Sequence, residues 1–276
     1  MLGVSEASVK RWADSGLLPM EKTAGGHRRF RPEDLASVRR ARPASDAERP
    51  TQRRQASAAR PSPALVEETF RALVGGQDDD LAALLVSLHL QGQTVGRIAD
   101  GLLCAAMRRV GEFWHAGRIS VAQEHVATRT AVVALQSLQA SLQRGAEAEG
   151  MRGLCCSVED DFHDLPLRLA ALTLEASGLA VFNLGASTPF SALAEAVQRF
   201  RPDLVCVSAT VLPRLDRAAH DYAGFIKVAR RAGAAVVLGG AGFSEEGVRR
   251  RLPADLHAES FRQLEEFVGN LDAGES

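Results

Sequence analysis

Cysteine and aromatic residues are scarce in this chain of 276 residues, which has four cysteines, two tryptophans and one tyrosine. The cysteines lie in apolar segments without metal-finger spacing, so we expect buried free thiols at Cys104, Cys155, Cys156 and Cys206. No apolar run approaches the roughly 20 residues of a membrane span. The N-terminus also lacks the apolar core of a secretory signal. These absences argue against a membrane or secreted protein and predict a cytoplasmic one.

The charge is divided unequally along the chain, although the net value is only −1. Residues 1–60 hold 13 Lys/Arg and 7 Asp/Glu, whereas the rest hold 20 and 27. A basic end on an acidic body suggests a polyanionic partner at that end. A basic solvated tail has the same composition, so charge leaves both interpretations open.

Composition and periodicity divide the remainder of the chain. Residues 41–63 contain no Ile, Leu, Val, Met or aromatic residue and have prolines at 43, 50, 61 and 63, which predicts a flexible linker. Residues 64–146 show apolar residues at helical spacing, with helix starts expected near 64, 78, 94 and 120. Four helices of this kind predict a four-helix bundle.

Residues 151–272 alternate short apolar strands with helical patterns. We expect strands at 154–158, 180–184, 204–208 and 235–238, with a weak fifth near 255–258. Helices are expected near 165–177, 190–200, 216–232 and 243–251, followed by a last one. Strand–helix alternation with fully apolar strands predicts a parallel sheet covered on both faces. Ligands in such folds bind at the carboxyl ends of the strands.

Unusual residues follow three of these strands. The loop Glu159–Pro166 carries Asp161 two residues before His163, and a carboxylate on one imidazole nitrogen makes the other a better metal donor. A solvent-facing loop histidine is the plainer alternative. Hydroxyls follow the third strand in Ser208-Ala209-Thr210, and Gly239-Gly240 follows the fourth. Glycines let a planar ligand approach the backbone, although a tight turn would use them equally well.

This pattern resembles the Asp-x-His-x-x-Gly motif of cobalamin-binding domains such as that of methionine synthase. In that family a Ser-x-Leu and a Gly-Gly follow at set distances. Here 41 residues separate Pro166 from Ser208, and 28 separate Thr210 from Gly239. The resemblance implies a Rossmann-like, flavodoxin-type cobalamin domain in which His163 is the lower axial cobalt ligand. The nucleotide tail would then enter a slot lined by Ser208, Thr210, Gly239 and Gly240, with Asp161 supporting His163.

Two residues depart from the family pattern. Pro166 stands where the family has Gly, and Thr210 where it often has Leu. Proline is accepted in the first turn of a helix, so we expect the fold to tolerate Pro166. Its ring adds bulk beneath the corrin.

The helical segment carries a second pattern, Trp114-His115 followed by Glu124-His125. A core tryptophan with a hydrogen-bonded histidine is the general interpretation. The segment is similar, however, to the Trp-x9-Glu-His motif of light-sensing, adenosylcobalamin-dependent repressors of carotenoid genes, the CarH/LitR-like photoreceptors. The resemblance implies that the bundle caps the upper face, with Trp114 on the adenosyl group and Glu124 and His125 hydrogen-bonding nearby. It also implies that His115 ligates cobalt after light cleaves the cobalt–carbon bond.

The basic end resembles the winged-helix DNA-binding domain of MerR-type regulators over residues 1–40. Ser5 begins a helix to Ser15, and the segment Thr23–Phe30 reads as a glycine-tipped wing. The family has a strand and a first helix before this turn, so we expect an N-terminally truncated domain. The resemblance assigns base or phosphate contacts in DNA to Ser8, Lys10 and Arg11, and backbone or minor-groove contacts to His27, Arg28 and Arg29.

The leading hypothesis is therefore a multidomain, cobalamin-dependent photoreceptor and repressor, with a partial winged helix-turn-helix, a four-helix bundle and a cobalamin domain. By family analogy it forms a tetramer in darkness, binds a promoter operator and comes apart in light. One alternative is a corrinoid methyl carrier, which needs neither the wing nor His115. Another is a sensor without DNA binding that holds cobalamin alone or together with a second, bilin chromophore. No nucleophile–base pair suggests an enzyme.

Overall fold

The computed structural model describes residues 21–22, 28–29, 61–142 and 150–274. The chain forms two compact units, residues 1–59 and 60–276. In the first unit, strand β1 (Glu21–Lys22) pairs antiparallel with β2 (Arg28–Arg29). This pairing is consistent with the wing expected over residues 23–30. The helix predicted for residues 5–15 and most of the predicted linker lie outside the described residues.

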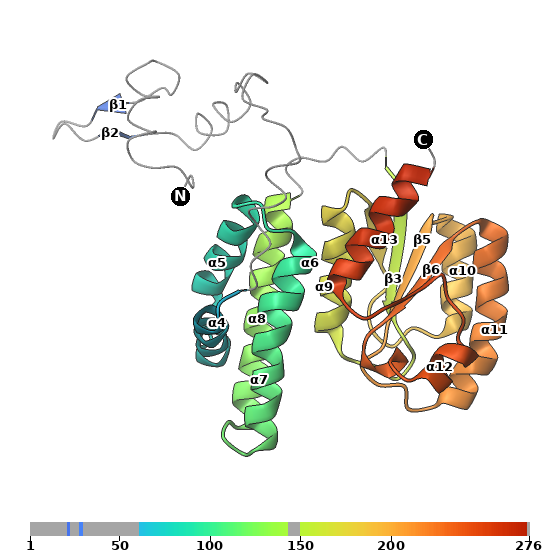
Figure 1. The fold of residues 1–276 in the computed structure, drawn as a ribbon, viewed down its shortest axis with the longest axis horizontal. Helices are drawn as coiled ribbons and strands as arrows, with labels where there is room; N and C mark the ends of the chain where they lie inside the picture. Colours follow the sequence, from blue (N-terminus) through green and yellow to red (C-terminus); the bar gives the residue numbers. More distant parts are fainter. Residues whose placement is uncertain (1–20, 23–27, 30–60, 143–149, 275–276) are drawn as a thin grey trace. The chain divides into compact units, whose positions relative to one another are not determined.

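The second unit begins with a helical half, residues 63–142. It comprises α4 (Pro63–Gly75), α5 (Asp78–Leu90), α6 (Val95–Ile98), the π-helical turn η2 (Ala99–Leu103), α7 (Cys104–His115) and α8 (Val121–Leu142). Because α6, η2 and α7 follow one another without a break, they make one continuous helical segment. Residues 63–142 therefore contain four such segments: α4, α5, α6–α7 and α8 (Figure 1). The predicted helix starts are confirmed to within one residue.

Capping side chains explain where these helices begin. Ser62 accepts a hydrogen bond from the Leu65 N–H, and Thr94 accepts one from the Arg97 N–H. Ser120 and Gln123 exchange side-chain-to-backbone bonds of 3.0 and 3.2 Å, which is the capping-box arrangement. Pro63, placed in the predicted linker, is instead the first residue of α4, a position where its missing N–H has no consequence.

The sheet half, residues 150–274, is a five-stranded parallel sheet. Its strands are β3 (Arg152–Ser157), β4 (Ala180–Asn183), β5 (Leu204–Ser208), β6 (Ala235–Gly239) and β7 (Leu256–Ala258), in the spatial order β4-β3-β5-β6-β7. Counted along the chain this is the flavodoxin-like order 2-1-3-4-5. The predicted strands and the parallel sheet are confirmed.

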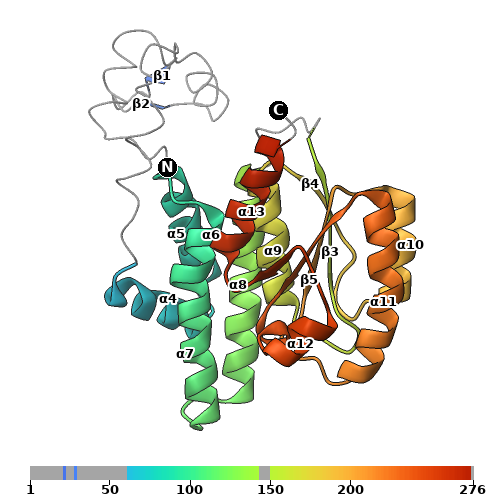
Figure 2. The same cartoon turned by 45° about the vertical axis from the view of Figure 1, so that its right-hand side comes forward.

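Helices cover both faces of this sheet, as predicted (Figures 1 and 2). The helices α10 (Phe190–Phe200) and α11 (Leu215–Ala232) bury one face, and α9 (Asp164–Ala176) and α13 (Phe261–Gly274) bury the other. The helix expected near 243–251 divides into a 3-10 turn, Ala241–Phe243, and α12 (Glu246–Arg251). Hydrogen bonds from Phe243 N–H to Gly240 O and from Ser244 N–H to Ala241 O tighten this turn and delay the α-helix.

One helix, α9, belongs to two hydrophobic cores. Its residues Leu165, Leu169 and Leu172 pack into the core of the helical half. Leu167, Ala170, Ala171 and Leu174 pack against the sheet. A helix that is apolar all round is a buried one. The two halves are therefore joined through α9.

A reciprocal pair of carboxylates also joins the halves. Glu265 of α13 accepts hydrogen bonds at the start of α6, from the Thr94 hydroxyl at 2.7 Å and the Gly96 N–H at 2.8 Å. Asp100 of η2 accepts from the Phe261 and Arg262 N–H groups, at 2.9 and 3.0 Å, at the start of α13. Each half thus caps a helix of the other, where carboxylates also suit the helix dipole. A Cβ at Gly96 would lie 2.9 Å from the backbone oxygen of Phe261 and 2.7 Å from the Glu265 carboxyl carbon, so a larger residue there would push the two helix ends apart.

Two expectations from the sequence concern the burial of the cysteines and the lack of a membrane span. All four cysteines are free, as predicted, and Cys155, Cys156 and Cys206 are buried; Cys104, which was also expected to be buried, is only half-buried. Burial raises the pKa of the Cys104 thiol to about 11. No helix in the described part of the chain is long and apolar enough to span a membrane.

We predict that Glu265→Gln lowers the free energy of unfolding by about 1–3 kcal/mol, because a charged acceptor of two hydrogen bonds becomes a neutral amide. Urea unfolding of the ligand-free protein measures this. The matched control is Glu266→Gln, since the one side-chain interaction of Glu266 among the described residues is an exposed pair with Arg262 at 3.7 Å, which should contribute less than about 0.5 kcal/mol. Equal effects of the two changes would argue against the capping role.

Candidate cofactor-binding site

The crevice of this sheet lies between β3 and β5. The chain leaves β3 for β4 on one side and then crosses to β5 on the other, so the loops after β3 and β5 diverge at the carboxyl edge. Ligands bind at such switch points. The two loops that flank the crevice are residues 158–163 and 209–214, which contain His163 and Thr210.

Asp161 ties these two loops together. It is fully buried. One carboxylate oxygen accepts from His163 Nδ1 at 2.6 Å and from the His163 N–H at 3.1 Å, and the other accepts from the Thr210 N–H at 2.6 Å. An ionised carboxylate only accepts hydrogen bonds, so Nδ1 carries the proton and the lone pair remains on Nε2. Because 55% of the His163 side chain is exposed, an imidazole of defined tautomer is offered to a ligand.

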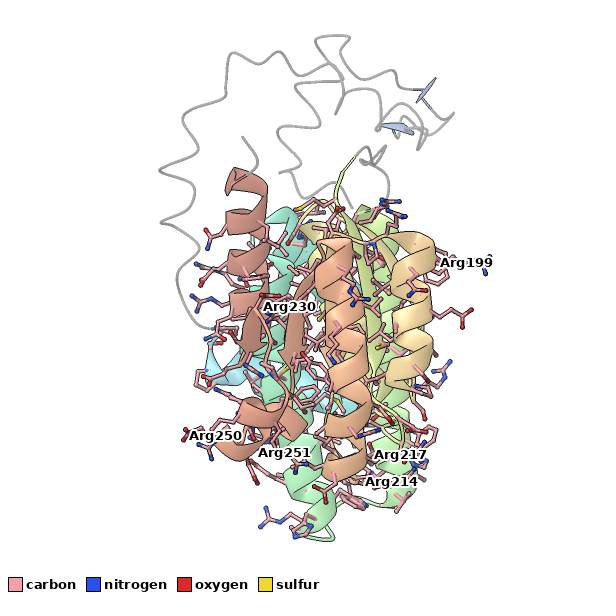
Figure 3. The ribbon with its side chains drawn as sticks, turned by 90° about the vertical axis from the view of Figure 1, so that its right-hand side faces the viewer. Arg199, Arg214, Arg217, Arg230, Arg250 and Arg251 are labelled. Atoms are coloured by element: carbon pink, nitrogen blue, oxygen red, sulfur yellow. The ribbon has the colours of Figure 1, made fainter. Side chains whose placement is uncertain are left out.

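Two further acidic residues of the same loop pair with arginines at the start of α11, its N-cap Arg214 and Arg217 in its first turn. Asp160 forms an ion pair with Arg214, and Glu159 forms one with Arg217 at 3.1 Å. Figure 3 labels Arg214 and Arg217, which lie at the same end of α11. Asp160 has a φ of +66°, in the left-handed region that Asp and Asn tolerate better than most residues. Its N–H donates to the Ser187 hydroxyl at 3.1 Å. These exposed pairs contribute little energy each, but they hold the loop on both sides of Asp161.

A row of small residues crosses the carboxyl edge on the face covered by α9 and α13. Strand register places Ser157 beside Ser208, Ser208 beside Gly239, and Gly239 beside Ala258. All four positions face the same side of the sheet as the residues two positions earlier in each strand. Those earlier residues lie in the core beneath α9 and α13, and they are larger: Cys155, Cys206, Val237 and Leu256. We call Ser157, Ser208, Gly239 and Ala258 the small row; Ser157 and Ser208 in it are buried.

The glycines after β6 serve the protein's own backbone. Gly240 has a φ of +104°, and a Cβ there would lie 2.4 Å from the Ala209 carbonyl oxygen. A Cβ at Gly242 would lie 2.9 Å from the Ala209 Cβ. Close packing of the β5 and β6 loops thus requires Gly240, whereas Gly239 has no such conflict. The tight-turn alternative for Gly240 agrees with this geometry.

Pro166 is accommodated as expected. It is the third residue of α9, whose N-cap is His163. The first N–H groups of a helix have no partner within it, so proline breaks no hydrogen bond there. The ring is half-buried.

The second group of candidate residues surrounds the turn from α7 to α8. Trp114 and His115 end α7, and both are exposed, with 48% of Trp114 accessible. Glu124 lies in the first turn of α8, accepts from the Thr128 hydroxyl at 2.9 Å and lies 3.5 Å from His125 Nε2. The core-tryptophan interpretation is therefore wrong. Within the described ranges, no hydrogen bond or ring contact joins Trp114 to Glu124 or His125.

Sequence reasoning missed several exposed apolar side chains near both groups. Phe162 is 75% exposed and Val211 44% exposed in the two crevice loops, and Val121 at the start of α8 is 54% exposed. The α7–α8 turn and the carboxyl edge of the sheet lie at the same end of this unit (Figures 1 and 2). Ser157 was also missed, because only strand register reveals that it adjoins Ser208.

The DNA-contact candidates lie mostly outside the described residues. Ser8, Lys10, Arg11 and His27 are among those not described. Arg28 and Arg29 form β2, paired with Lys22 and Glu21 respectively.

Comparison with family models covers most of the chain. A helix-turn-helix domain matches residues 1–43, and two B12 binding domain models match residues 65–139 and 151–261. The HTH-type transcriptional repressor CarH of Myxococcus xanthus is 27% identical over 91% of this chain and 90% of its own length. The repressor CarA of the same organism is 27% identical over 89% of this chain and 85% of its own. The chain is a CarH-like, cobalamin-binding transcriptional regulator.

The regulator also resembles corrinoid proteins over part of its length. Dimethylamine corrinoid protein 1 of Methanosarcina mazei is 22% identical over 55% of this chain and 70% of its own. Among solved structures, the monomethylamine corrinoid protein of Methanosarcina barkeri matches with a TM-score of 0.59 and 19% identity, over 74% of this chain and 96% of that one. At this identity the match shows a shared fold.

Asp161→Asn should lower the free energy of unfolding of the ligand-free regulator by about 1–3 kcal/mol. The Asn side chain has an NH₂ group in place of one carboxylate oxygen. This group would face His163 Nδ1–H or the Thr210 N–H, which are themselves donors, so a hydrogen bond would be lost. Urea unfolding measures the change, with Asp160→Asn as the neighbouring control. Because Asn suits the left-handed conformation of residue 160, the control should change stability by less than about 0.5 kcal/mol. A harmless Asp161→Asn would show that the bridge between the loops is unimportant.

Proposed function

We propose that this regulator is a light-responsive repressor that uses adenosylcobalamin as its chromophore. The observation that carries the proposal is the arrangement at one end of the second unit. An exposed imidazole of defined tautomer, His163, lies at the same end as the exposed Trp114-His115 pair. In this proposal residues 1–40 form the DNA-binding domain, and residues 41–63 connect it to the helical half. Residues 64–146 cover the upper face of the cofactor, and residues 151–272 bind its lower face.

The lower side fits cobalamin in three respects. His163 Nε2 is free to coordinate cobalt, because Asp161 occupies Nδ1. The proposal places the nucleotide tail at the small side chains of Ser208 and Gly239, which are neighbours across β5 and β6, with Thr210 and Gly240 next to them in the loops. Phe162 and Val211 present apolar surface where a corrin ring would lie.

The upper side fits an adenosyl group. Trp114 offers a large exposed aromatic face, and Glu124 and His125 offer hydrogen-bonding groups one helix away. Adenosylcobalamin supplies a cobalt–carbon bond that light can break. His115, next to Trp114, is the imidazole that we propose as upper ligand in the lit state.

Regulation follows from contact with both halves. A ligand that touches the helical and sheet halves favours the state in which they fit together. We propose that this state assembles into a tetramer that occupies a promoter operator through the helix-turn-helix domain, with Ser8, Lys10, Arg11, His27, Arg28 and Arg29 contacting DNA. Loss of the upper group removes that preference and the assembly separates.

The alternative is a corrinoid methyl carrier. The similarity to dimethylamine corrinoid proteins over 52–71% of this chain favours it. A carrier would hold an exchangeable methyl group and would show no lasting response to light. It would also give no role to His115 or to the helix-turn-helix domain, and for this reason the repressor is the preferred function.

His163→Ala should weaken cobalamin binding by about tenfold or more, because the proposed lower ligand of cobalt is lost. The spectrum of histidine-ligated cobalt should disappear for the same reason. Titration followed by absorption measures both. His220→Ala, an exposed histidine of α11, is the control and should bind normally. Unchanged affinity and spectrum in His163→Ala would sink the lower-ligand assignment.

Green light should convert the adenosylcobalamin-loaded protein to a stable species with a bis-imidazole-type spectrum and a smaller size on gel filtration. The stable spectrum should be lost in His115→Ala and kept in His89→Ala, which alters another histidine of the helical half. Binding without a lasting photoproduct or size change would contradict light sensing and favour the methyl carrier.

A further inference from the structure

The arginines of the sheet half divide into a paired set and an unpaired set. The paired arginines lie in α12 or at the start or in the first half of α9, α11 or α13, and each forms an ion pair with Asp or Glu: Arg168, Arg214, Arg217, Arg249, Arg250, Arg251 and Arg262. The others are exposed and form no ion pair with a described residue: Arg152, Arg199, Arg201, Arg230 and Arg231. We call these others the amino-edge cluster. Figure 3 shows two of its members, Arg199 and Arg230, toward the opposite end of the α10–α11 face from Arg214 and Arg217.

The cluster lies where helices end and strands begin. Arg152 is the first residue of β3, Arg201 is the C-cap of α10, and Arg231 lies in the last turn of α11. Asp203 joins these three segments, because its carboxylate accepts from the Arg152 N–H at 2.7 Å and its carbonyl accepts from the Ala235 N–H at 2.9 Å. The cluster is therefore at the amino edge of the sheet, at the other end from His163.

The carboxylates described at this edge already have hydrogen-bond partners. Asp203 and Asp255 each accept from a backbone N–H at 2.7 Å. Glu175, near the end of α9, accepts from the Gln139 side chain at 2.7 and 2.9 Å. Exposed like charges that no carboxylate pairs with repel one another, and such a surface attracts a polyanion.

Helix geometry accounts for part of this placement, because cations are favourable at the C-terminal ends of helices. It does not account for Arg201. This residue has a φ of +45°, in the left-handed region, which costs free energy for a residue with a Cβ and almost none for glycine. The C-caps of α4 and α11 have the same backbone conformation and are Gly76 and Gly233. An arginine at a position that suits glycine indicates a use for its side chain.

We propose that the amino-edge cluster binds backbone phosphates of the DNA duplex that the helix-turn-helix domain of the same chain contacts. The proposal rests on the proposed function, in which the protein occupies an operator. Guanidinium groups pair with phosphate oxygens through two parallel hydrogen bonds, and these contacts add affinity without reading sequence. The match of residues 1–43 to a helix-turn-helix domain is what makes DNA the partner of this surface.

The test uses the full chain, loaded with adenosylcobalamin in darkness, and a labelled mixed-sequence duplex of about 40 base pairs, between about 50 and 200 mM salt. Each phosphate contact contributes about 0.9 to the slope of log affinity against log salt concentration. The triple variant Arg199→Gln, Arg201→Gln, Arg231→Gln should lower this slope by about 2–3, and the affinity at about 50 mM salt by about tenfold or more. Fluorescence anisotropy measures both quantities.

The matched control is the triple variant Arg250→Gln, Arg251→Gln, Arg262→Gln. It removes the same charge from exposed arginines that carboxylates already pair with. Its affinity should stay within about twofold of the unaltered protein, with the slope unchanged.

Arg201→Gly separates DNA binding from stability. Glycine suits the left-handed conformation, so the Tm should rise or stay the same. The slope for the duplex should nevertheless fall by about 0.9, because one phosphate contact is lost. A role confined to the end of α10 predicts unchanged DNA binding.

Four results would overturn the assignment of the cluster. These are an unchanged slope in the cluster variant, an equal fall in the control, unchanged binding in Arg201→Gly, and a smaller assembly of the cluster variant on gel filtration, which would mean that this edge joins copies of the chain. If the unaltered protein binds no duplex at about 50 mM salt, DNA binding in the proposed function fails as well, and that outcome is distinct from an unchanged slope.

Discussion

The burial of α9 on both sides is the constraint on which the second unit depends. Its two apolar faces belong to different cores, and each buried leucine contributes about 1.5–3 kcal/mol through removal from water. Neither half can leave α9 without exposing one of those faces. Because His163 is the N-cap of the same helix, the candidate ligand is attached to the element that joins the halves.

Much of this architecture could be predicted from sequence because its signals are local. Strand β5 at Leu204–Ser208 is fully apolar until its final serine, and its predicted bounds match the structure. The Asp161–His163 bond was also predictable, because two residues of separation suffice for a side chain to reach an imidazole. The spacing from Pro166 to Ser208 and on to Gly239 carried the resemblance to cobalamin domains, which the family models bear out.

Other features depend on residues that are distant in sequence, so no local pattern reveals them. Ser157 reads as part of an apolar strand until register sets it beside Ser208. The bond from Glu265 to Gly96 spans 169 residues, and neither residue is unusual in its own segment. The need for Gly240 arises from the carbonyl of Ala209, which belongs to another loop. Asp160 reads as one more acidic loop residue, and only the structure shows its left-handed backbone.

The reciprocal caps between η2 and α13 have a mechanical consequence. Four hydrogen bonds of 2.7–3.0 Å connect two carboxylates to the starts of two helices. Hydrogen bonds weaken steeply as distance and angle depart from these values, so sliding one helix by an ångström or two loosens all four together. Packed interfaces of this kind are bistable rather than continuously deformable. The four hydrogen bonds should therefore be formed together or lost together, so this contact between the halves has two states and does not lengthen gradually.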